Sequence, residues 1–212
     1  WEWQYYTGRT ENCRIEDGIL ILEARKENYN GKNYTSARIK TQNKQSFQYG
    51  RIEARIKMPV GGEGIWPAFW MLGHNIPSAG WPACGEIDIV ELMRDPTTAI
   101  GAIHYGSSSP YVHQSNSGND KTVGNMSSGF HIYAIEWEPT QIRWYRDDYN
   151  YYTSSTWWSG TGSYPAPFNQ PFFILLNFAV GASWWDKAIT DSVVPFPQQF
   201  NVDYVRVYQM EP

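Results

Sequence analysis

The chain has 212 residues and a formal net charge of −4, and this length suits one domain with one well-buried core. Lysine and arginine are interspersed among the acids, so no basic face follows a nucleic-acid backbone and no polybasic patch binds a membrane. We therefore expect neither partner. Aromatic residues make up 17% of the chain, more than a core requires, and flat rings stack well on the apolar faces of sugars.

The chain also carries no signal for membrane insertion. No apolar run approaches the roughly 20 residues of a spanning helix, and no basic start precedes an apolar stretch and a cleavage site. We expect a soluble chain from which any export signal has been removed. Cys13 and Cys84 fit neither a metal site nor a redox pair, and two unpaired thiols are favoured over a disulfide.

Apolar and polar residues alternate with a period of two in several stretches of the chain, whereas helical periodicity is almost absent. In residues 50–57, Ile52, Ala54 and Ile56 share one face and charged residues fill the other, which predicts a half-buried strand. We predict further strands at 18–25, 34–41, 130–138, 142–146 and 202–209. Clusters of Gly, Pro, Asn and Asp separate them, and many short strands with turn signals predict a β-sandwich.

Two segments depart from this alternation. Residues 172–180 are apolar at both odd and even positions except for Asn177, which predicts a central strand with one amide facing a cleft. Residues 107–128 are rich in Ser, Gly and Asn, and we predict a long surface loop there.

One apolar segment, 85–92, contains three acids: Glu86, Asp88 and Glu91. In a regular strand Glu91 would share a face with Ile87, which belongs in the core. An unpaired charge buried there would cost several kcal/mol. A β-bulge at Ile89 and Val90 returns Glu91 to the face of the other two acids. We therefore predict a bulged strand.

The bulged geometry suits a pair of catalytic carboxylates. Four effective strand steps separate the two glutamate backbones by about 13 Å, and leaning side chains leave about 5 Å between the carboxyls. That spacing is typical of a retaining glycosidase, with ionised Glu86 as nucleophile and protonated Glu91 as acid. Asp88 lies between them and is expected to orient Glu86. From the strand alone, three acids facing solvent on an outer sheet surface are an equal alternative.

Seven segments in order along the chain carry a resemblance to glycoside hydrolase family 16, in its laminarinase-like branch of endo-β-1,3-glucanases. They are the E-I-D-I-V-E run at 86–91, the W-P-A-F-W-M-L run at 66–72, and the segments 34–38, 49–55, 80–82, 131–137 and 202–208. The resemblance implies an all-β jelly-roll sandwich of the concanavalin A type with a concave substrate cleft. It also implies a secreted, monomeric enzyme that needs no cofactor for catalysis.

The resemblance assigns roles to individual residues. It implies Glu86 as nucleophile, Asp88 as its assistant and Glu91 as acid and base. It places His104 on the neighbouring strand, close to the acid group. Four tryptophans match positions beside the glucose subsites, and we expect at least one to be structural instead: Trp66, Trp70, Trp81 and Trp184.

Arg51 and Arg55 share the polar face of their strand and are candidate donors to sugar hydroxyls. Ion pairing with Glu53 is an equally favoured use for them. Asp203 matches a ligand of the structural calcium in the family, so the resemblance adds a candidate Ca²⁺ site there.

The chain differs from the family pattern at two places. It begins after the segment that carries an Asp-Glu-Phe motif and a first strand, so we expect a single catalytic domain at 1–212 that lacks one side of the cleft. Residues 181–184 also replace the usual paired glycines with Ala182 and Ser183.

Two other functions remain open. The bulged spacing favours laminarin-type β-1,3-glucans, with mixed β-1,3/1,4-glucans as a second substrate, over strict mixed-linkage cleavage. Agarases and carrageenases share the bulge, so hydrolysis of a galactan is a rival within the family. A non-catalytic β-glucan-binding module is the alternative from another class, although such relatives usually lack one or both glutamates.

Overall fold

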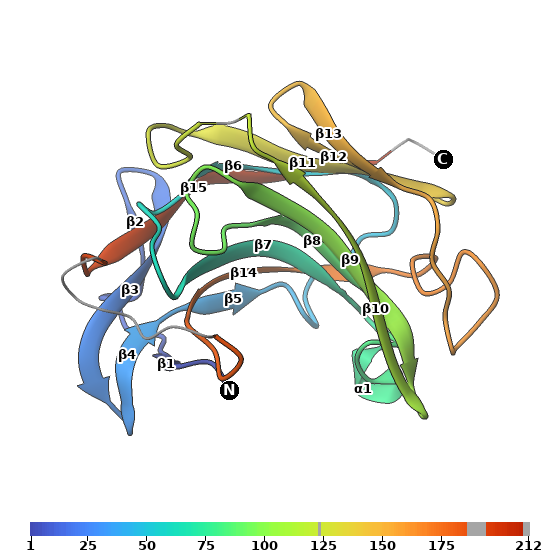
Figure 1. Cartoon of the computed structure of the whole chain (residues 1–212), viewed down its shortest axis with the longest axis horizontal. Helices are drawn as coiled ribbons and strands as arrows, with labels where there is room; N and C mark the ends of the chain where they lie inside the picture. Colours follow the sequence, from blue (N-terminus) through green and yellow to red (C-terminus); the bar gives the residue numbers. More distant parts are fainter. Residues whose placement is uncertain (123, 186–193, 210–212) are drawn as a thin grey trace.

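The computed structural model describes residues 1–122, 124–185 and 194–209 of the chain. Within these residues, two β-sheets are stacked and curve in the same direction (Figure 1), and the only helix is the four-residue α1 (Ile76–Ala79). No helix in this part of the chain has the length and apolar character needed to cross a membrane. The prediction of an all-β sandwich is confirmed.

The outer layer is a nine-stranded sheet. Its strands, in spatial order, are β1 (Gln4–Tyr6), β4 (Lys32–Ser36), β3 (Ile19–Tyr29), β15 (Gln198–Tyr208), β6 (Gly50–Lys57), β11 (His131–Glu138), β12 (Gln141–Arg146) and β13 (Tyr149–Ser154), with β2 (Cys13–Glu16) paired to β3. The inner, concave layer has six strands: β10 (Tyr111–Asp120), β9 (Ala99–Ser108), β8 (Glu86–Glu91), β7 (Ile65–Gly73), β14 (Phe172–Val180) and β5 (Arg38–Lys40).

The core lies between the two layers. Ile52 and Ile56 on β6 and Ile135 on β11 are fully buried, as are Phe69 on β7 and Ile87 on β8. These residues all lie at alternate positions of their strands, so the period-two pattern marks the faces that meet. The opposite face of the inner sheet is therefore left to form a concave surface.

Several strand predictions are confirmed, and one predicted strand turns out to be two strands. Strand β6 has the predicted bounds, and β14 lies between β7 and β5 with every residue buried. The strand predicted at 34–41 instead forms β4 in the outer sheet and β5 in the inner sheet. The break falls at the buried Ala37, whose carbonyl accepts a hydrogen bond from the backbone of Phe178. The chain thus crosses between layers within one apparent strand.

The prediction of a surface loop at 107–128 is wrong for most of that segment. Strand β10 pairs with β9 over ten residues, from Tyr111 opposite Ser108 to Asp120 opposite Ala99. Most β10 side chains are exposed because the strand lies at the edge of its sheet. An edge strand with little burial needs no apolar alternation, which explains the polar composition.

Both cysteines are free thiols, as predicted. Cys84 is fully buried, and burial raises the pKa of its thiol to about 12. It is therefore a packing residue rather than a reactive one.

The predicted bulge in β8 is present. Asp88 pairs with Trp70 and Glu91 with Ala68, so three residue steps on β8 face two on β7. The same mismatch occurs on the other side, where Asp88 pairs with Ala102 and Glu91 with Ile100 of β9. The extra residue returns Glu91 to the concave face with the other two acids, while Ile89 and Val90 stay in the core.

Side chains of the outer sheet bind the backbone at the bulge. The indole Nε1 of the buried Trp144 donates to the Asp88 carbonyl at 2.7 Å, and the Tyr151 hydroxyl donates to the Ile89 carbonyl at 3.4 Å. Trp144 reaches this position over Gly101 of β9, where an added Cβ would lie 2.4 Å from the indole Cδ1. The missing side chain at Gly101 therefore makes room for the indole that holds the bulge.

The substitution Gly101→Ala should destabilise the fold, because the new methyl group would overlap a fully buried ring that cannot move freely. We expect a loss of about 1–3 kcal/mol in the free energy of unfolding, measured by urea denaturation. Gly129→Ala is the matched control, since an added Cβ there meets nothing within 4 Å. Equal stability of the two variants would contradict the proposed contact.

Candidate active site

A cleft of about 480 Å³ lies on the concave face over β7, β8 and β14. Among its lining residues are all three predicted carboxylates, three of the four predicted tryptophans and the predicted amide: Glu86, Asp88, Glu91, Trp66, Trp70, Trp81 and Asn177. The β7–β8 register explains this gathering, because residues 66, 68, 70 and 72 lie on the same face as the acids opposite them.

Each glutamate accepts a hydrogen bond from a tryptophan. Trp81 Nε1 donates to Glu86 Oε2 at 3.1 Å, and Trp66 Nε1 donates to Glu91 Oε1 at 2.6 Å. Both donors are rigid, so they fix the carboxyl groups as well as stabilise their charged forms. The tryptophans that line the cleft thus also orient its acids.

The three carboxyl groups all have raised pKa values. Burial, followed by the charge of Asp88, raises the pKa of Glu86. Burial and then the charge of Glu91 raise the pKa of Asp88. Burial also raises the pKa of Glu91, although the Trp66 hydrogen bond and the charge of His104 oppose the change. Because each ionised acid disfavours ionisation of its neighbours, the cluster retains a proton beside an ionised carboxylate.

His104 lies directly opposite Glu86 in the β8–β9 ladder. Its Nε2 is 3.2 Å from Asp88 Oδ2 and 4.0 Å from Glu86 Oε1. Its Nδ1 is 2.8 Å from His113 Nε2, and the two rings stack with centroids 5.1 Å apart. Burial, followed by the charge of His104, lowers the pKa of His113.

Trp66 and Trp70 each contact further polar or aromatic residues at the cleft. Trp70 Nε1 donates to Asn177 Oδ1 at 2.7 Å, which joins β7 to β14 across the cleft floor. The ring of Trp184, 51% exposed, packs edge-on against Trp66 with centroids 5.2 Å apart. Trp1 also packs on Trp66, at 6.0 Å. Trp184 therefore lies beside the cleft lining, at the end marked by Trp66.

Arg51 lies away from the cleft. It is on β6 of the outer sheet, where its guanidinium pairs with Glu53 at 2.8 Å and Glu136 at 3.4 Å. Of its two predicted uses, the ion pair is present and the donation to sugar in the cleft is wrong. The alternation identified a polar face, but that face is the outer surface of the other sheet.

Asp203 also lies in the outer sheet, at an irregularity of β15. Its Oδ2 accepts a hydrogen bond from Arg55 Nη1 at 2.7 Å, so an arginine already compensates its charge. Calcium takes six to eight oxygen ligands, usually several of them carboxylate oxygens. In the described part of the chain, no group of three metal-ligating side chains includes Asp203. In the described part of the chain Asp203 is thus a carboxylate already paired with an arginine, and the calcium site stays a prediction.

Two residues in or beside the cleft were not predicted. Arg38 of β5 lies opposite Asn177, and its guanidinium pairs with Glu2 at 2.8 Å and lies over the Trp70 ring. Arg38 stands in one of the segments that carry the family resemblance, which was the available signal. His113 lies in the segment predicted as a loop, so nothing in the alternation placed it beside His104.

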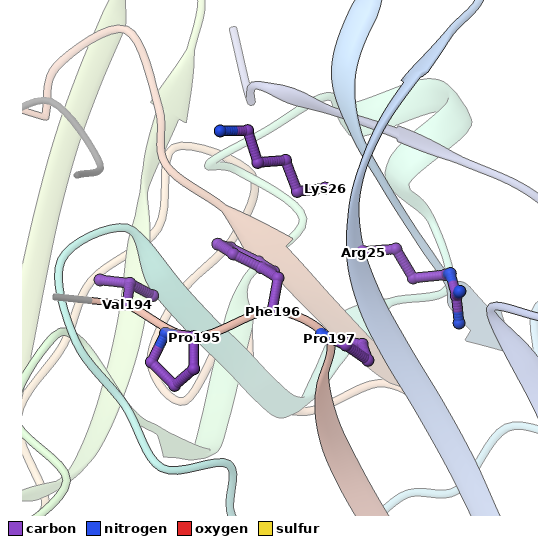
Figure 2. Close-up of a pocket in the computed structure, with 6 residues that line it drawn as sticks. All are labelled: Arg25, Lys26, Val194, Pro195, Phe196 and Pro197. Atoms are coloured by element: carbon purple, nitrogen blue, oxygen red, sulfur yellow. The ribbon is translucent and has the colours of Figure 1, made fainter. Parts of the chain in front are cut away.

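A second hollow, of about 360 Å³, lies between β3 and the segment 194–197 (Figure 2). Arg25 and Lys26 line it on the β3 side, and Val194, Phe196 and two prolines line it on the other. None of the described residues that line it is a carboxylate. Of these two hollows, the first alone brings carboxylates together among the described residues.

The model of glycosyl hydrolases family 16 matches residues 2–206. The chain belongs to glycosyl hydrolase family 16. The resemblance first drawn from short segments thus holds over almost the whole sequence, and the chain is a glycoside hydrolase by family.

Similar proteins within the family share the fold as well as the sequence. A β-glucanase of Rhodothermus marinus is 42% identical over 98% of this chain and 74% of its own length. The laminarinase catalytic domain of Thermotoga maritima has a TM-score of 0.82 and 38% identity, covering 100% of this chain and 84% of that one. A LamA variant from Z. galactanivorans, solved with laminaritriose and laminaritetraose, has a TM-score of 0.83 and 34% identity, covering 98% and 85%.

The Trp66→Phe substitution tests the hydrogen bond to Glu91. The indole N–H stabilises the ionised carboxylate, so its loss should raise the pKa of Glu91. Carboxyl-carbon NMR titration measures this shift. Trp70→Phe is the matched control, because that indole donates to Asn177 instead. An unchanged or lowered Glu91 pKa in Trp66→Phe, or an equal rise in the control, would contradict the assignment.

Proposed function

We propose that this chain is a retaining endo-hydrolase of internal β-1,3-glucosidic bonds in laminarin-type glucans, with mixed β-1,3/1,4-glucans as second substrates. The observation that carries the proposal is the bulge in β8, which brings Glu86, Asp88 and Glu91 to one face at the floor of a tryptophan-lined cleft. The names of the similar β-glucanase and laminarinases support the choice of substrate.

Glu86 and Glu91 divide the chemistry between them. The ionised Glu86 carboxylate attacks the anomeric carbon while protonated Glu91 gives its proton to the departing glycosidic oxygen. A covalent glycosyl ester on Glu86 results, and the leaving chain departs as an alcohol. Glu91 is now ionised and removes a proton from water, which attacks the same carbon and releases Glu86. Two inversions at one carbon give net retention.

Asp88 and His104 support this cycle without forming bonds to the sugar. His104 lies within 4.0 Å of both Glu86 and Asp88, so a proton on its ring favours ionised Glu86. Asp88 has the opposite influence, since its charge raises the Glu86 pKa. The balance between the two sets the pH at which the nucleophile is ionised.

The aromatic residues of the cleft provide the substrate-binding surface. We assign stacking on glucose rings to Trp66, Trp70, Trp81 and Trp184, since β-linked glucose presents apolar ring faces. The amide of Asn177 is a hydrogen-bond partner for a sugar hydroxyl as well as for Trp70. The indoles of Trp66 and Trp81 couple this surface to the acids, because they touch both.

We also propose where the enzyme acts, its oligomeric state and its need for cofactors and metals. A polymeric glucan does not cross a cell membrane, so we place the enzyme outside the cell, acting as a monomeric catalytic domain. The two-carboxylate reaction requires no cofactor. A structural Ca²⁺ at Asp203 stays a prediction, and a rise in melting temperature on adding CaCl₂, reversed by EDTA, would establish it.

One feature of the cleft speaks against each of the two rival functions. A binding-only module has no need of the paired, proton-sharing carboxylates that this cleft retains. A hydrolase of sulfated galactans needs cations in its cleft. Among the described residues that line the cleft, Arg38 is the one cationic side chain, and it is paired with Glu2. Activity on agarose or carrageenan alone would favour the galactan; tight laminarin binding without cleavage would favour the module.

Glu86→Gln and Glu91→Gln should each lower laminarin hydrolysis by at least about a thousandfold, because each removes a group that forms or breaks a bond. A reducing-sugar assay measures the loss. Glu136→Gln is the control, since that carboxylate lies on the outer sheet and pairs with arginines. Near-normal activity of either cleft variant would contradict the assigned roles.

The stereochemistry of the first product is an independent check. The direct attack of Glu86 predicts β-configured oligosaccharides at early times, before mutarotation, as followed by proton NMR on laminarin. Initial α-configured products would show that water, rather than Glu86, attacks the sugar.

A further inference from the structure

Two acids that line the cleft, Glu86 and Asp88, form with the neighbouring His104 a group that has the composition of a metal site. One potential ligand atom from each of Glu86, Asp88 and His104 lies within 4.8 Å of the other two. His104 Nε2 is 3.2 Å from Asp88 Oδ2 and 4.0 Å from Glu86 Oε1. Ligand atoms bound to one tetrahedral ion at about 2.0–2.2 Å stand roughly 3.3–3.5 Å apart. The 3.2 Å contact is close to that spacing, and the 4.0 Å contact exceeds it.

A second observation points to a ligand at the same place. Asp88 is 3% exposed, and its Oδ2 is buried without a hydrogen-bond partner. The contact with His104 Nε2 is short but lacks hydrogen-bond geometry. A buried carboxylate oxygen normally has a donor or a cation, because burying it bare is costly. A cation shared by this oxygen and His104 Nε2 would compensate the buried charge.

The surroundings of His104 complete the arrangement. Its Nδ1 lies 2.8 Å from His113 Nε2. In the tautomer that carries its proton on Nδ1, this N–H donates to His113 and the Nε2 lone pair faces the carboxylates. Metal-bound histidines usually make this kind of hydrogen bond through the second ring nitrogen, which fixes tautomer and orientation. His113 also packs on Trp81, at 4.6 Å between ring centroids, so its own position is fixed.

We propose that Glu86, Asp88 and His104 bind one Zn²⁺ ion, with the fourth coordination position open to the cleft. A nitrogen ligand with two carboxylate oxygens suits zinc, whereas calcium and magnesium prefer oxygen alone. The bound ion would occupy the Glu86 carboxylate and so block attack on a sugar. Zinc would then be a reversible inhibitor that competes with glucan. The inhibition rests on the proposed function; the binding of the ion does not.

Isothermal titration of the EDTA-treated, dialysed chain with ZnCl₂, in the absence of glucan, tests the site. We expect one Zn²⁺ per chain. His104→Gln should weaken binding at least tenfold, and His113→Phe, which keeps the ring but removes the acceptor nitrogen, should weaken it by about 10- to 100-fold. His131→Gln is the matched control, because His131 contacts a single carboxylate, Asp147, at 3.0 Å, and should bind zinc like the wild type.

Cobalt substitution gives a readout independent of affinity. A Co²⁺-loaded wild-type chain should show the intense visible absorption of a four-coordinate ion, and Asp88→Asn should reduce it even where His104→Gln fails to fold. Unchanged zinc affinity in His104→Gln with native circular dichroism, loss of binding in His131→Gln, or no stoichiometric binding at all would overturn the proposal. Laminarin cleavage without zinc binding would refute this site alone, whereas zinc binding without cleavage would refute the proposed function alone.

Discussion

The single extra residue in β8 is the constraint on which the site depends. Without it, Glu91 would point into the core between the sheets, where an uncompensated charge would cost several kcal/mol. With it, Ile89 and Val90 fill the core while all three acids reach the concave face. The irregular backbone is held from behind by Trp144, an outer-sheet residue that hydrogen-bonds the Asp88 carbonyl. Core packing and the catalytic arrangement are thus one structural feature.

Burial gives the acids the properties that the chemistry requires. The cleft raises the pKa of all three carboxyl groups, and the tryptophan N–H groups and His104 act against that rise at selected oxygens. The same indoles line the cleft. Substrate binding and acid positioning are therefore coupled, so a change in one of these tryptophans is expected to alter both sugar affinity and proton transfer.

The sequence predicted the site better than it predicted its surroundings. The parity of apolar residues around Glu86 and Glu91 was sufficient to deduce the bulge, because only one arrangement keeps charges out of the core. The apolar character of β14 likewise marked a central strand with Asn177 facing the cleft. These predictions succeeded because burial imposes a pattern on the chain itself.

The failures concern relations between distant segments. The alternation in β6 showed that Arg51 is on a polar face but could not show that this face belongs to the outer sheet. Strand β10 has an exposed, polar composition, so the pairing that brings His113 to His104 left no apolar signal. The hydrogen bond from Trp144 to the Asp88 carbonyl joins residues 56 positions apart. It depends on how the two sheets stack, which no local sequence pattern shows.

The central claim is that Glu86 forms a covalent bond with the sugar, and trapping the glycosyl-enzyme tests it most directly. A 2-deoxy-2-fluoro-laminaribiosyl fluoride should react to give a glycosyl ester that accumulates on the enzyme. The fluorine at C2 slows hydrolysis of this ester, while the fluoride leaving group allows the ester to form. Proteolysis and mass spectrometry would then locate the added mass. The account predicts the label on Glu86, within the peptide that contains β8. A label on Glu91, or turnover of laminarin with no adduct on either glutamate, would contradict it.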